Sequence, residues 1–352
     1  MEYTITRHYN QDIITSWESL WKKSPQVTYA NSSAWFLSVL KSFDYKEYAI
    51  VRVYNKKELV AIAGFVKEKK YGISFYTVAP GDFVCGLPML LDIHNKTVVR
   101  TFLTALNELG TVSFDNIPEE IVAAFREQTS LLSASEQTIN LYFAIEKDEK
   151  GAVRIPKRSR LTNRIKGQED DFTMRTFDGA TSEGLDIIFA IDEQSSKQHK
   201  GYSTFSDKTI KTFYKEFASQ FGKQFLAAIL YYKERPIAYY IGFLAGNTYF
   251  WSQNAFIADY QQYSPGKILL VKLIDFLGKQ NVTIVDFGSG DYRMKRLLTN
   301  DYHKLFFVVL AKNTFIRNYF INVTKLKNAV YEQLHQRALI YTLYRKAKNI
   351  HK

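Results

Sequence analysis

Cysteine is almost absent from this chain of 352 residues, which contains only Cys85. One cysteine cannot form an internal disulfide bond or a cysteine-based zinc site. The six histidines are scattered without the spacing of metal ligands, so we expect no metal. The sequence also lacks a Gly-x-Ser-x-Gly elbow and a Gly-x-x-x-x-Gly-Lys-Ser/Thr loop. These absences argue against a metalloenzyme, a serine hydrolase with a nucleophile elbow and a P-loop nucleotidase.

Long apolar runs are missing as well. No stretch reaches the roughly 18 uninterrupted apolar residues of a membrane-spanning helix. The first residues, Met1–Arg7, lack the apolar run of a signal peptide. A hydrophobic share of 46% is nevertheless ordinary for a globular protein. We therefore expect a folded protein that stays in the cytoplasm.

Acidic residues are scarce in two zones of the chain, whose formal net charge is +12. Residues 311–352 hold nine Lys and Arg residues and one acid, Glu332. Arg154–Lys166 hold six basic residues and no acid. Because the rest of the chain is close to neutral, these zones indicate anionic partners at defined places.

The order of predicted elements repeats in the two halves of the chain. In each half, helices precede three strands joined by short turns, and a helix and a further strand follow. The three strands are expected at 48–54, 59–66 and 72–78, and again at 224–232, 236–244 and 248–254. Other elements are expected as helices at 156–166 and 182–197, and as strands at 138–145, 282–287 and 303–311.

This repetition predicts a duplicated α/β (α+β) fold, with a mixed and mostly antiparallel sheet flanked by helices in each half. We expect domains at 1–150 and 151–312, followed by a helical tail at 313–352.

The tail places apolar residues at three- and four-residue steps, as an amphipathic helix does. They are Ile316, Tyr319, Phe320, Val323, Leu326, Val330, Leu334, Ala338 and Tyr341. Three interpretations stay open: a helix docked on the protein body, an interfacial helix on an anionic membrane, or a basic helix that binds nucleic acid.

The loop after the strand 248–254 ends in Gln261–Lys267, and this stretch has the features of an anion site. Pro265 suits a first helical turn, where its missing N–H costs no hydrogen bond. Gly266 lets a ligand approach the backbone closely. The free N–H groups, the helix dipole and the charge of Lys267 would together hold an anion. The same residues also fit a helix start that is capped by Ser264 and binds nothing.

The spacing Gln261-x-x-Ser264-x-Gly266 resembles the pyrophosphate loop of GNAT acetyltransferases, Gln/Arg-x-x-Gly-x-Gly/Ala, with serine in place of the first glycine. Residues 285–296 read Val-Asp-Phe-Gly-Ser-Gly-Asp-Tyr-Arg-Met-Lys-Arg. They are similar to the Asp-Phe-Gly-x-Gly signature of CelD/BcsL-type acetyltransferases, which are linked to exopolysaccharide synthesis. They also resemble the Tyr-x-Phe-Lys segment of the FemABX peptidyltransferases.

Two upstream stretches resemble further elements of the CelD/BcsL type. They are residues 199–205, His-Lys-Gly-Tyr-Ser-Thr-Phe, and the basic stretch 156–160, Pro-Lys-Arg-Ser-Arg. The resemblance covers most of residues 10–310 and implies two tandem GNAT-like domains, with the donor site in the second.

The resemblance also implies that acetyl-CoA or another acyl-CoA binds in a V-shaped gap between two central strands. The donor phosphates would lie against the loop, and a backbone N–H near Asn254 or Ala255 would polarise the thioester carbonyl. The implied donor site consists of Asn254, Ala255, Gln261, Ser264, Pro265, Gly266, Lys267 and Ile268.

Four residues are catalytic candidates. By resemblance Lys295 faces the acceptor or the developing negative charge, although it also fits a surface lysine of a basic loop. Asp286 and Asp291 are candidates to accept a proton from the acceptor. Asp286 fits a cap of the turn at 288–290 equally well. His199 is a candidate base or sugar ligand, and it also fits an exposed helix end.

The implied function is acyl transfer to an amine or hydroxyl of a sugar, polysaccharide or cell-envelope precursor. Residues expected to contact the acceptor are Lys200, Tyr202, Trp251, Tyr263 and Tyr292. Trp251 and Tyr263 fit core positions as well. Two alternatives stay open: a Fem-like transfer from aminoacyl-tRNA to a peptidoglycan precursor, and a GNAT-like binding module without catalysis. Apart from tRNA, we expect no nucleic-acid partner.

Overall fold

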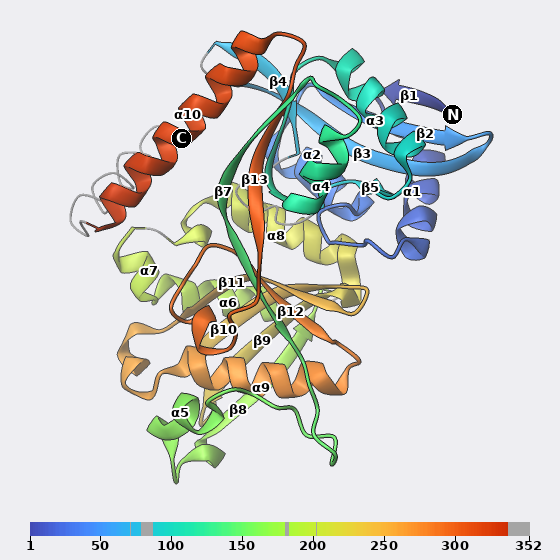
Figure 1. Cartoon of the computed structure of the whole chain (residues 1–352). Coiled ribbons are helices and arrows are strands. Elements are labelled where there is room, and N and C mark those ends of the chain that lie inside the picture. The colour runs from blue at the N-terminus through green and yellow to red at the C-terminus, as the bar shows by residue number, and fades with distance from the viewer. Residues whose placement is uncertain (71, 79–86, 180–182, 202, 337–352) are drawn as a thin grey trace. The chain divides into compact units, whose positions relative to one another are not determined.

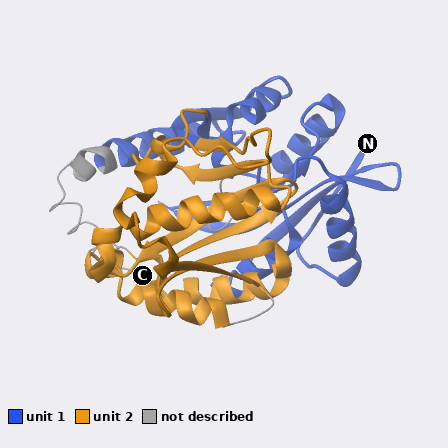
Figure 2. Ribbon diagram, turned by 90° about the horizontal axis from the view of Figure 1, so that it is seen from below, with its two compact units in different colours: residues 1–140, 302–330 blue, residues 141–301, 331–352 orange. Residues whose placement is uncertain are grey.

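The structure, a computed structural model, describes residues 1–70, 72–78, 87–179, 183–201 and 203–336. It has a mixed α/β fold with sheet strands flanked by helices (Figure 1). The chain forms two compact units, coloured separately in Figure 2. Met1–Asn140 and Tyr302–Val330 belong to the first unit, and Leu141–Asp301 belong to the second.

In the first unit the strands follow the order β1, β2, β3, β4, β6, β13, β7, and β5 pairs with β3. Neighbouring strands are antiparallel from β1 to β4 and from β6 to β13, whereas β4 and β6 are parallel. The strands are β1 (Glu2–Thr6), β2 (Tyr48–Asn55), β3 (Glu58–Lys70), β4 (Ile73–Thr77), β5 (Leu90–Leu91), β6 (Val112–Pro118), β7 (Leu132–Ala144) and β13 (Tyr302–Leu310). The last residues of β7, from Leu141 on, belong to the second unit. The helices are α1 (Gln11–Lys23), α2 (Ser33–Phe43), α3 (Lys96–Leu109), α4 (Glu119–Arg126) and α10 (Thr314–Gln336).

In the second unit the order is β12, β11, β10, β9, β8, and only β11 and β12 are parallel among these neighbours. The strands are β8 (Phe172–Asp178), β9 (Phe225–Tyr232), β10 (Arg235–Ala245), β11 (Thr248–Phe256) and β12 (Ile284–Ser289). The helices are α5 (Arg158–Thr162), α6 (Glu183–Glu193), α7 (Ser196–His199), α8 (Lys208–Phe221) and α9 (Pro265–Lys279). Short 3₁₀ turns include η2 (Asn163–Ile165), η4 (Thr204–Ser206), η6 (Ala258–Tyr263) and η7 (Lys295–Leu297).

The two units repeat one arrangement of elements. In the first, the antiparallel strands β2, β3 and β4 are followed by α3 and by β6, which is parallel to β4. In the second, β9, β10 and β11 are followed by α9 and by β12, which is parallel to β11. The predicted fold class, a mixed α/β fold whose mostly antiparallel strands are flanked by helices, is confirmed, although all the strands belong to one sheet.

Two neighbouring tyrosines show that α6 and α9 cover opposite faces of the sheet strands in the second unit. Consecutive side chains of a strand point to opposite faces. On β10, the Tyr239 hydroxyl donates to Asp192 of α6 at 2.7 Å, and the Tyr240 hydroxyl donates to Gly266 O of α9 at 3.1 Å. The start of α9 and the end of α6 therefore contact the sheet from different sides.

Two predicted helices are shorter than expected. The helix predicted at 182–197 ends at Glu193, because Ser195 is extended, pairs with Ile257 and caps α7 through its side chain. The helix predicted at 156–166 is α-helical only over Arg158–Thr162 and continues as the 3₁₀ turn η2. Lys157 has a left-handed backbone, with φ of 54°, so the helix cannot begin before it.

Two strand predictions differ in extent or in partner. The strand predicted from 138 begins at Leu132. The strand expected at 303–311, in the second half of the chain, is β13, which pairs with β6 of the first unit. Chain order therefore does not give the composition of the units.

Candidate functional site

The parallel strands β11 and β12 separate beyond a short ladder. Their register joins Thr248 to Ile284, Tyr249 to Val285 and Phe250 to Asp286. β11 then continues for six residues to Phe256 and β12 for three residues to Ser289, and both lie wholly within the described residues. Residues 251–254 of β11 are only half-buried. The sheet is thus open between these strand ends.

A β-bulge changes the direction of β11 where the strands separate. Opposite Ile241 and Gly242 of β10 lie Gln253 and Trp251, so Ser252 is the extra residue. The Ser252 hydroxyl is 2.7 Å from that of Tyr214, which holds the bulge from α8. Burial raises the pKa of Tyr214 to about 12, so its hydroxyl keeps its proton at neutral pH.

The backbone groups of β11 alternate between β10 and the gap. Ile257 N–H donates to Ile237 O at 2.9 Å. Because groups of an antiparallel strand alternate in direction, those of Ala255 face β10, whereas those of Asn254 face away from it. Lys197 Nζ accordingly donates to Asn254 O at 2.5 Å. Of the two residues predicted to polarise a carbonyl, Asn254 has the better-directed N–H.

The start of α9 has an unusual backbone but no side-chain cap. Ser264 adopts a left-handed conformation, with φ of 56° and ψ of 53°, and its side chain makes no capping hydrogen bond. The expected side-chain cap is therefore wrong. Ser264 instead presents its carbonyl, which accepts Lys267 N–H at 2.9 Å and Ile268 N–H at 3.4 Å. Since Pro265 has no N–H, the first N–H of the helix belongs to Gly266.

The space beside Gly266 is open. A Cβ atom placed there would meet only the Tyr240 hydroxyl at 3.9 Å and Phe256 Cδ1 at 4.0 Å, which are ordinary contacts. Packing therefore does not require glycine at this position. By contrast, a Cβ atom on Gly278 of the same helix would lie 2.4 Å from Val153 Cγ2.

Basic residues of the 154–166 zone lie beside the loop. Arg164 Nη1 donates to Gln262 O at 3.1 Å, which joins η2 to η6. Arg158 forms a bidentate ion pair with Asp275 of α9, at 2.5 and 2.6 Å. These contacts hold a basic segment against the start and one side of α9. The exposed basic side chains of this segment are Arg154, Lys157, Arg160, Arg164 and Lys166.

Lys295 closes the turn at the end of β12. Its ammonium group donates to the carbonyls of Gly288 and Ser289 at 2.8 Å and of Gly290 at 3.1 Å, and the residue is 6% exposed. An ammonium group has three donors, so these carbonyls satisfy it. Asp286 supports the same turn by accepting Gly288 N–H at 2.8 Å. In this structure both residues shape the turn.

Asp291 is held by Arg296 through two hydrogen bonds of 2.8 and 2.9 Å. These bonds lower the pKa of the Asp291 carboxyl, with a smaller contribution from the charge of Lys295. A carboxylate with a lowered pKa is a weaker proton acceptor.

A buried carboxylate that was not predicted anchors the 195–206 segment. Asp192 is 2% exposed and accepts hydrogen bonds from the hydroxyls of Tyr239 and Ser203. Burial and the charge of Asp192 raise the pKa of Tyr239 well above its usual value, which keeps it a donor. Thr204 Oγ1 also donates to Gln253 Oε1 of β11 at 3.0 Å. These bonds bring the segment that carries His199 to the open strand.

The remaining predicted residues are spread around these elements. His199 and Lys200 are exposed, as is Tyr292 at 52%, and Tyr202 lies outside the described residues. The Trp251 ring packs against Tyr240 and Phe287, with centroids 4.7 and 5.3 Å apart.

Tyr263, in the loop of residues 261–267, belongs to an aromatic cluster. Its ring stacks on Tyr232 at 5.2 Å and meets Phe172 edge-on at 5.4 Å. Gln261 of the same loop is exposed.

Two residues of the site were not predicted. The sequence pattern could have indicated Asp192. It lies on the same side of α6 as the buried residues Leu185 and Ile188, where a charged side chain needs a partner. No sequence pattern indicated Lys197, because its hydrogen bond to Asn254 depends on the break between α6 and α7. Among the described residues, no group of three or more His, Cys, Asp or Glu side chains is placed to hold a metal ion.

Comparisons with known proteins agree with this architecture. Residues 157–296 match the sequence model of the family described as acetyltransferase (GNAT) domain. The chain has a GNAT fold. The match runs from α5 to the turn after β12, and it includes β11, β12 and the loop of residues 261–267. The comparison with curated proteins gives no match.

Solved structures with similar folds extend over both units. FemX has a TM-score of 0.64 at 10% identity, covering 88% of this chain and 97% of FemX. L-PGS from Bacillus licheniformis has a TM-score of 0.57 at 14% identity, covering 90% and 96%. A tandem GNAT protein from the clavulanic acid biosynthesis pathway has a TM-score of 0.50 at 11% identity, covering 89% and 100%. At such low identity these similarities establish a shared fold and nothing about substrates.

Proposed function

We propose that this protein is an acyltransferase that moves an acyl group from acyl-CoA to an amine or hydroxyl. The observation that carries the proposal is the opening between β11 and β12 beside the start of α9. The open strand supplies the Asn254 N–H, which faces away from β10, for an extended ligand, and the helix start supplies the Gly266 N–H and a positive dipole for its phosphates. One elongated donor with a pyrophosphate matches both features.

In this proposal the donor phosphates lie against Gly266 and Lys267, and the thioester carbonyl accepts the N–H of Asn254. That hydrogen bond stabilises the charge that develops on the carbonyl oxygen. The acceptor forms a bond to the carbonyl carbon, the carbon–sulfur bond breaks, and the acceptor's proton ends on the thiolate directly or through a base. Lys197 holds the backbone of β11 at Asn254 in place by donating to the Asn254 carbonyl.

The turn at 288–290 forms the other edge of the proposed site. In this proposal Lys295 and Asp286 do not contact the reacting atoms; they fix the shape of the turn through their hydrogen bonds to it. Asp291 and His199 remain candidates for the base; Asp291 is weakened by its bonds to Arg296, and His199 is exposed.

For the acceptor we propose a sugar, polysaccharide or cell-envelope precursor, as in the CelD/BcsL type that residues 285–296 resemble. A reaction in the cytoplasm, with peripheral association at the inner face of the membrane, suits such precursors. Among the described residues, no helix is both long and apolar enough to span a bilayer.

One observation favours a second candidate, aminoacyl transfer from tRNA. The exposed side chains of Lys157, Arg160 and Lys166 lie in the segment that Arg164 joins to the donor loop. A row of exposed cations beside a donor site suits a polyanion larger than coenzyme A. The similarity to FemX supports the fold of this candidate and not its donor.

Calorimetric titration with acetyl-CoA and with aminoacyl-tRNA separates the candidates. Acyl-CoA transfer predicts saturable binding of acetyl-CoA that Gly266→Asp abolishes, because the new carboxylate faces the phosphates. Binding of charged tRNA alone would support the Fem-like donor. Binding of neither would leave a module without catalysis and would overturn the proposed function.

A further inference from the structure

α10 carries apolar side chains on two opposite sides. Phe320 and Ile321 are buried in a core cluster with Phe75, Phe307 and Val309 of the first unit. This packing explains why the first half of α10 is part of that unit. A helix that only docks on the protein body needs no second apolar side.

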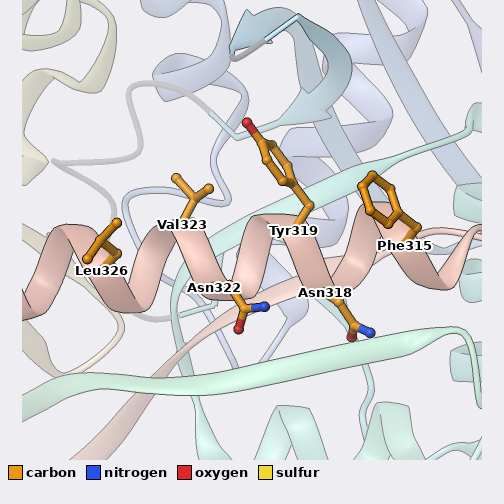
Figure 3. Close-up of a pocket in the computed structure, with 6 residues that line it drawn as sticks. All are labelled: Phe315, Asn318, Tyr319, Asn322, Val323 and Leu326. Atoms are coloured by element: carbon orange, nitrogen blue, oxygen red, sulfur yellow. The ribbon is translucent and has the colours of Figure 1, made fainter.

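The second side is an exposed stripe, defined here as Phe315, Tyr319, Val323, Leu326 and Val330. Within it Tyr319 and Val323 are half-buried, and Tyr319 also packs against the core cluster. Figure 3 shows the first four side chains of the stripe along one side of the helix. Phe315 is 74% exposed, Leu326 66% and Val330 42%. At 1.5 Å per residue the stripe extends for about 22 Å. Such a continuous apolar stripe on a helix surface marks an interaction site.

Charge decides the kind of partner. The chain has no acidic residue from Tyr302 to Tyr331. Lys325 and Lys327 are exposed and lie directly before and after Leu326 in the chain, about 100° to either side of it around the helix. Arg317, by contrast, is buried and donates to Ala311 O and Thr314 Oγ1 at the start of the helix.

We propose that the exposed stripe of α10 binds the surface of an anionic lipid bilayer. Its apolar side chains enter the boundary between headgroups and acyl chains, and Lys325 and Lys327 contact the anionic headgroups. The Phe315 ring suits the apolar side of this boundary, and the Tyr319 ring carries a hydroxyl group that can face water. The proposal does not depend on which donor the second unit binds.

The test is co-sedimentation of the full chain with vesicles of phosphatidylcholine, with and without phosphatidylglycerol. We expect binding only to the anionic vesicles, weakening as salt is raised. Phe315→Ser with Leu326→Ser should weaken binding by at least about tenfold, from the apolar area withdrawn. Lys325→Glu with Lys327→Glu should also weaken it by about tenfold or more.

Matched controls come from exposed residues elsewhere in the first unit. Lys22→Glu with Lys23→Glu makes the same change in charge on α1, and Tyr9→Ser removes another exposed aromatic ring. Both should bind like wild type. Circular dichroism spectra and unfolding midpoints close to wild type would show that the α10 variants are folded.

The proposal is overturned if wild type does not bind anionic vesicles, or if the Phe315 and Leu326 variant binds as well as wild type. It is also overturned if sedimentation velocity shows a stable dimer that the same variant dissolves, because a second copy would then cover the stripe. Loss of acetyl-CoA binding with vesicle binding intact would count against the proposed function and leave this inference standing.

Discussion

Replacement of Gly266 by alanine separates a ligand site from a mere helix start. The added methyl group meets no atom closer than 3.9 Å, and the residue does not have a positive φ. Alanine is favoured over glycine in helices by about 0.5–1 kcal/mol. Gly266→Ala should therefore leave the free energy of unfolding unchanged or raise it by up to about 1 kcal/mol.

Donor binding should respond in the opposite direction. The methyl group would occupy the space through which a phosphate oxygen reaches the first N–H of α9. Loss of one charge-assisted hydrogen bond costs about 1.5–3 kcal/mol, which is roughly 10–100-fold in Kd. Calorimetric titration with acetyl-CoA measures this, and urea unfolding of the same samples measures stability.

Gly278 provides the matched control on the same helix. Its added Cβ would lie 2.4 Å from Val153 Cγ2, so Gly278→Ala should lower the free energy of unfolding by about 1–3 kcal/mol through overpacking. Donor affinity of the folded protein should stay near wild type. If Gly266→Ala binds acetyl-CoA with an unchanged Kd, the phosphates do not lie against this helix start and the reasoning fails.

Three further predictions concern the edges of the site. Lys295→Met removes three hydrogen bonds and should lower the free energy of unfolding by about 2–4 kcal/mol, which urea unfolding measures as a lower midpoint. The control Lys279→Met changes an exposed lysine and should leave the midpoint unchanged. Equal midpoints for the two variants would refute the role of Lys295 in the turn. Lys197→Met should lower kcat about tenfold or more, with a small change in KM for the donor. Lys197→Arg should restore part of the lost kcat. A change in KM alone would contradict the role of Lys197 at Asn254. Asp291→Asn should cost less than about 1 kcal/mol at pH 7, because the pair is exposed. Since the pKa of Asp291 is lowered in the folded state, this contribution is fully present above the unfolded pKa of about 3.9 and is lost as the pH falls through the folded value. Urea unfolding at pH 7 and about pH 3 should therefore show a smaller difference between the variant and wild type in acid.

Local chemistry was enough to predict the elements of the donor loop. Pro265 fixes the first turn of α9, and the polar run before it cannot continue β11. The left-handed Ser264 was not predictable, because a left-handed backbone is rare for serine. The loop therefore has the predicted position, with a cap of another kind.

The positions of charged groups were harder to predict than the elements. Lys295 was predicted to face the acceptor because the sequence shows only its position in a motif and not its burial. Its burial against three carbonyls depends on the left-handed turns at Gly288 and Gly290, which no periodicity reveals. Asp192 and Lys197 likewise act through partners more than 40 residues away in the chain.

The pairing of β13 shows why chain order could not give the units, and it bears on how the tail is tested. Residues Leu305–Leu310 of this strand are all apolar, so their pattern does not indicate a partner strand. In the structure they pair with Val112–Pro118 of the first unit. Phe320 and Ile321 of α10 then pack on Phe307 of this strand. Deletion of 313–352 would remove these buried side chains together with the exposed stripe. A truncated protein that failed to bind vesicles would thus be explained equally by damage to the first unit, whereas substitutions at Phe315 and Leu326 change only the exposed side.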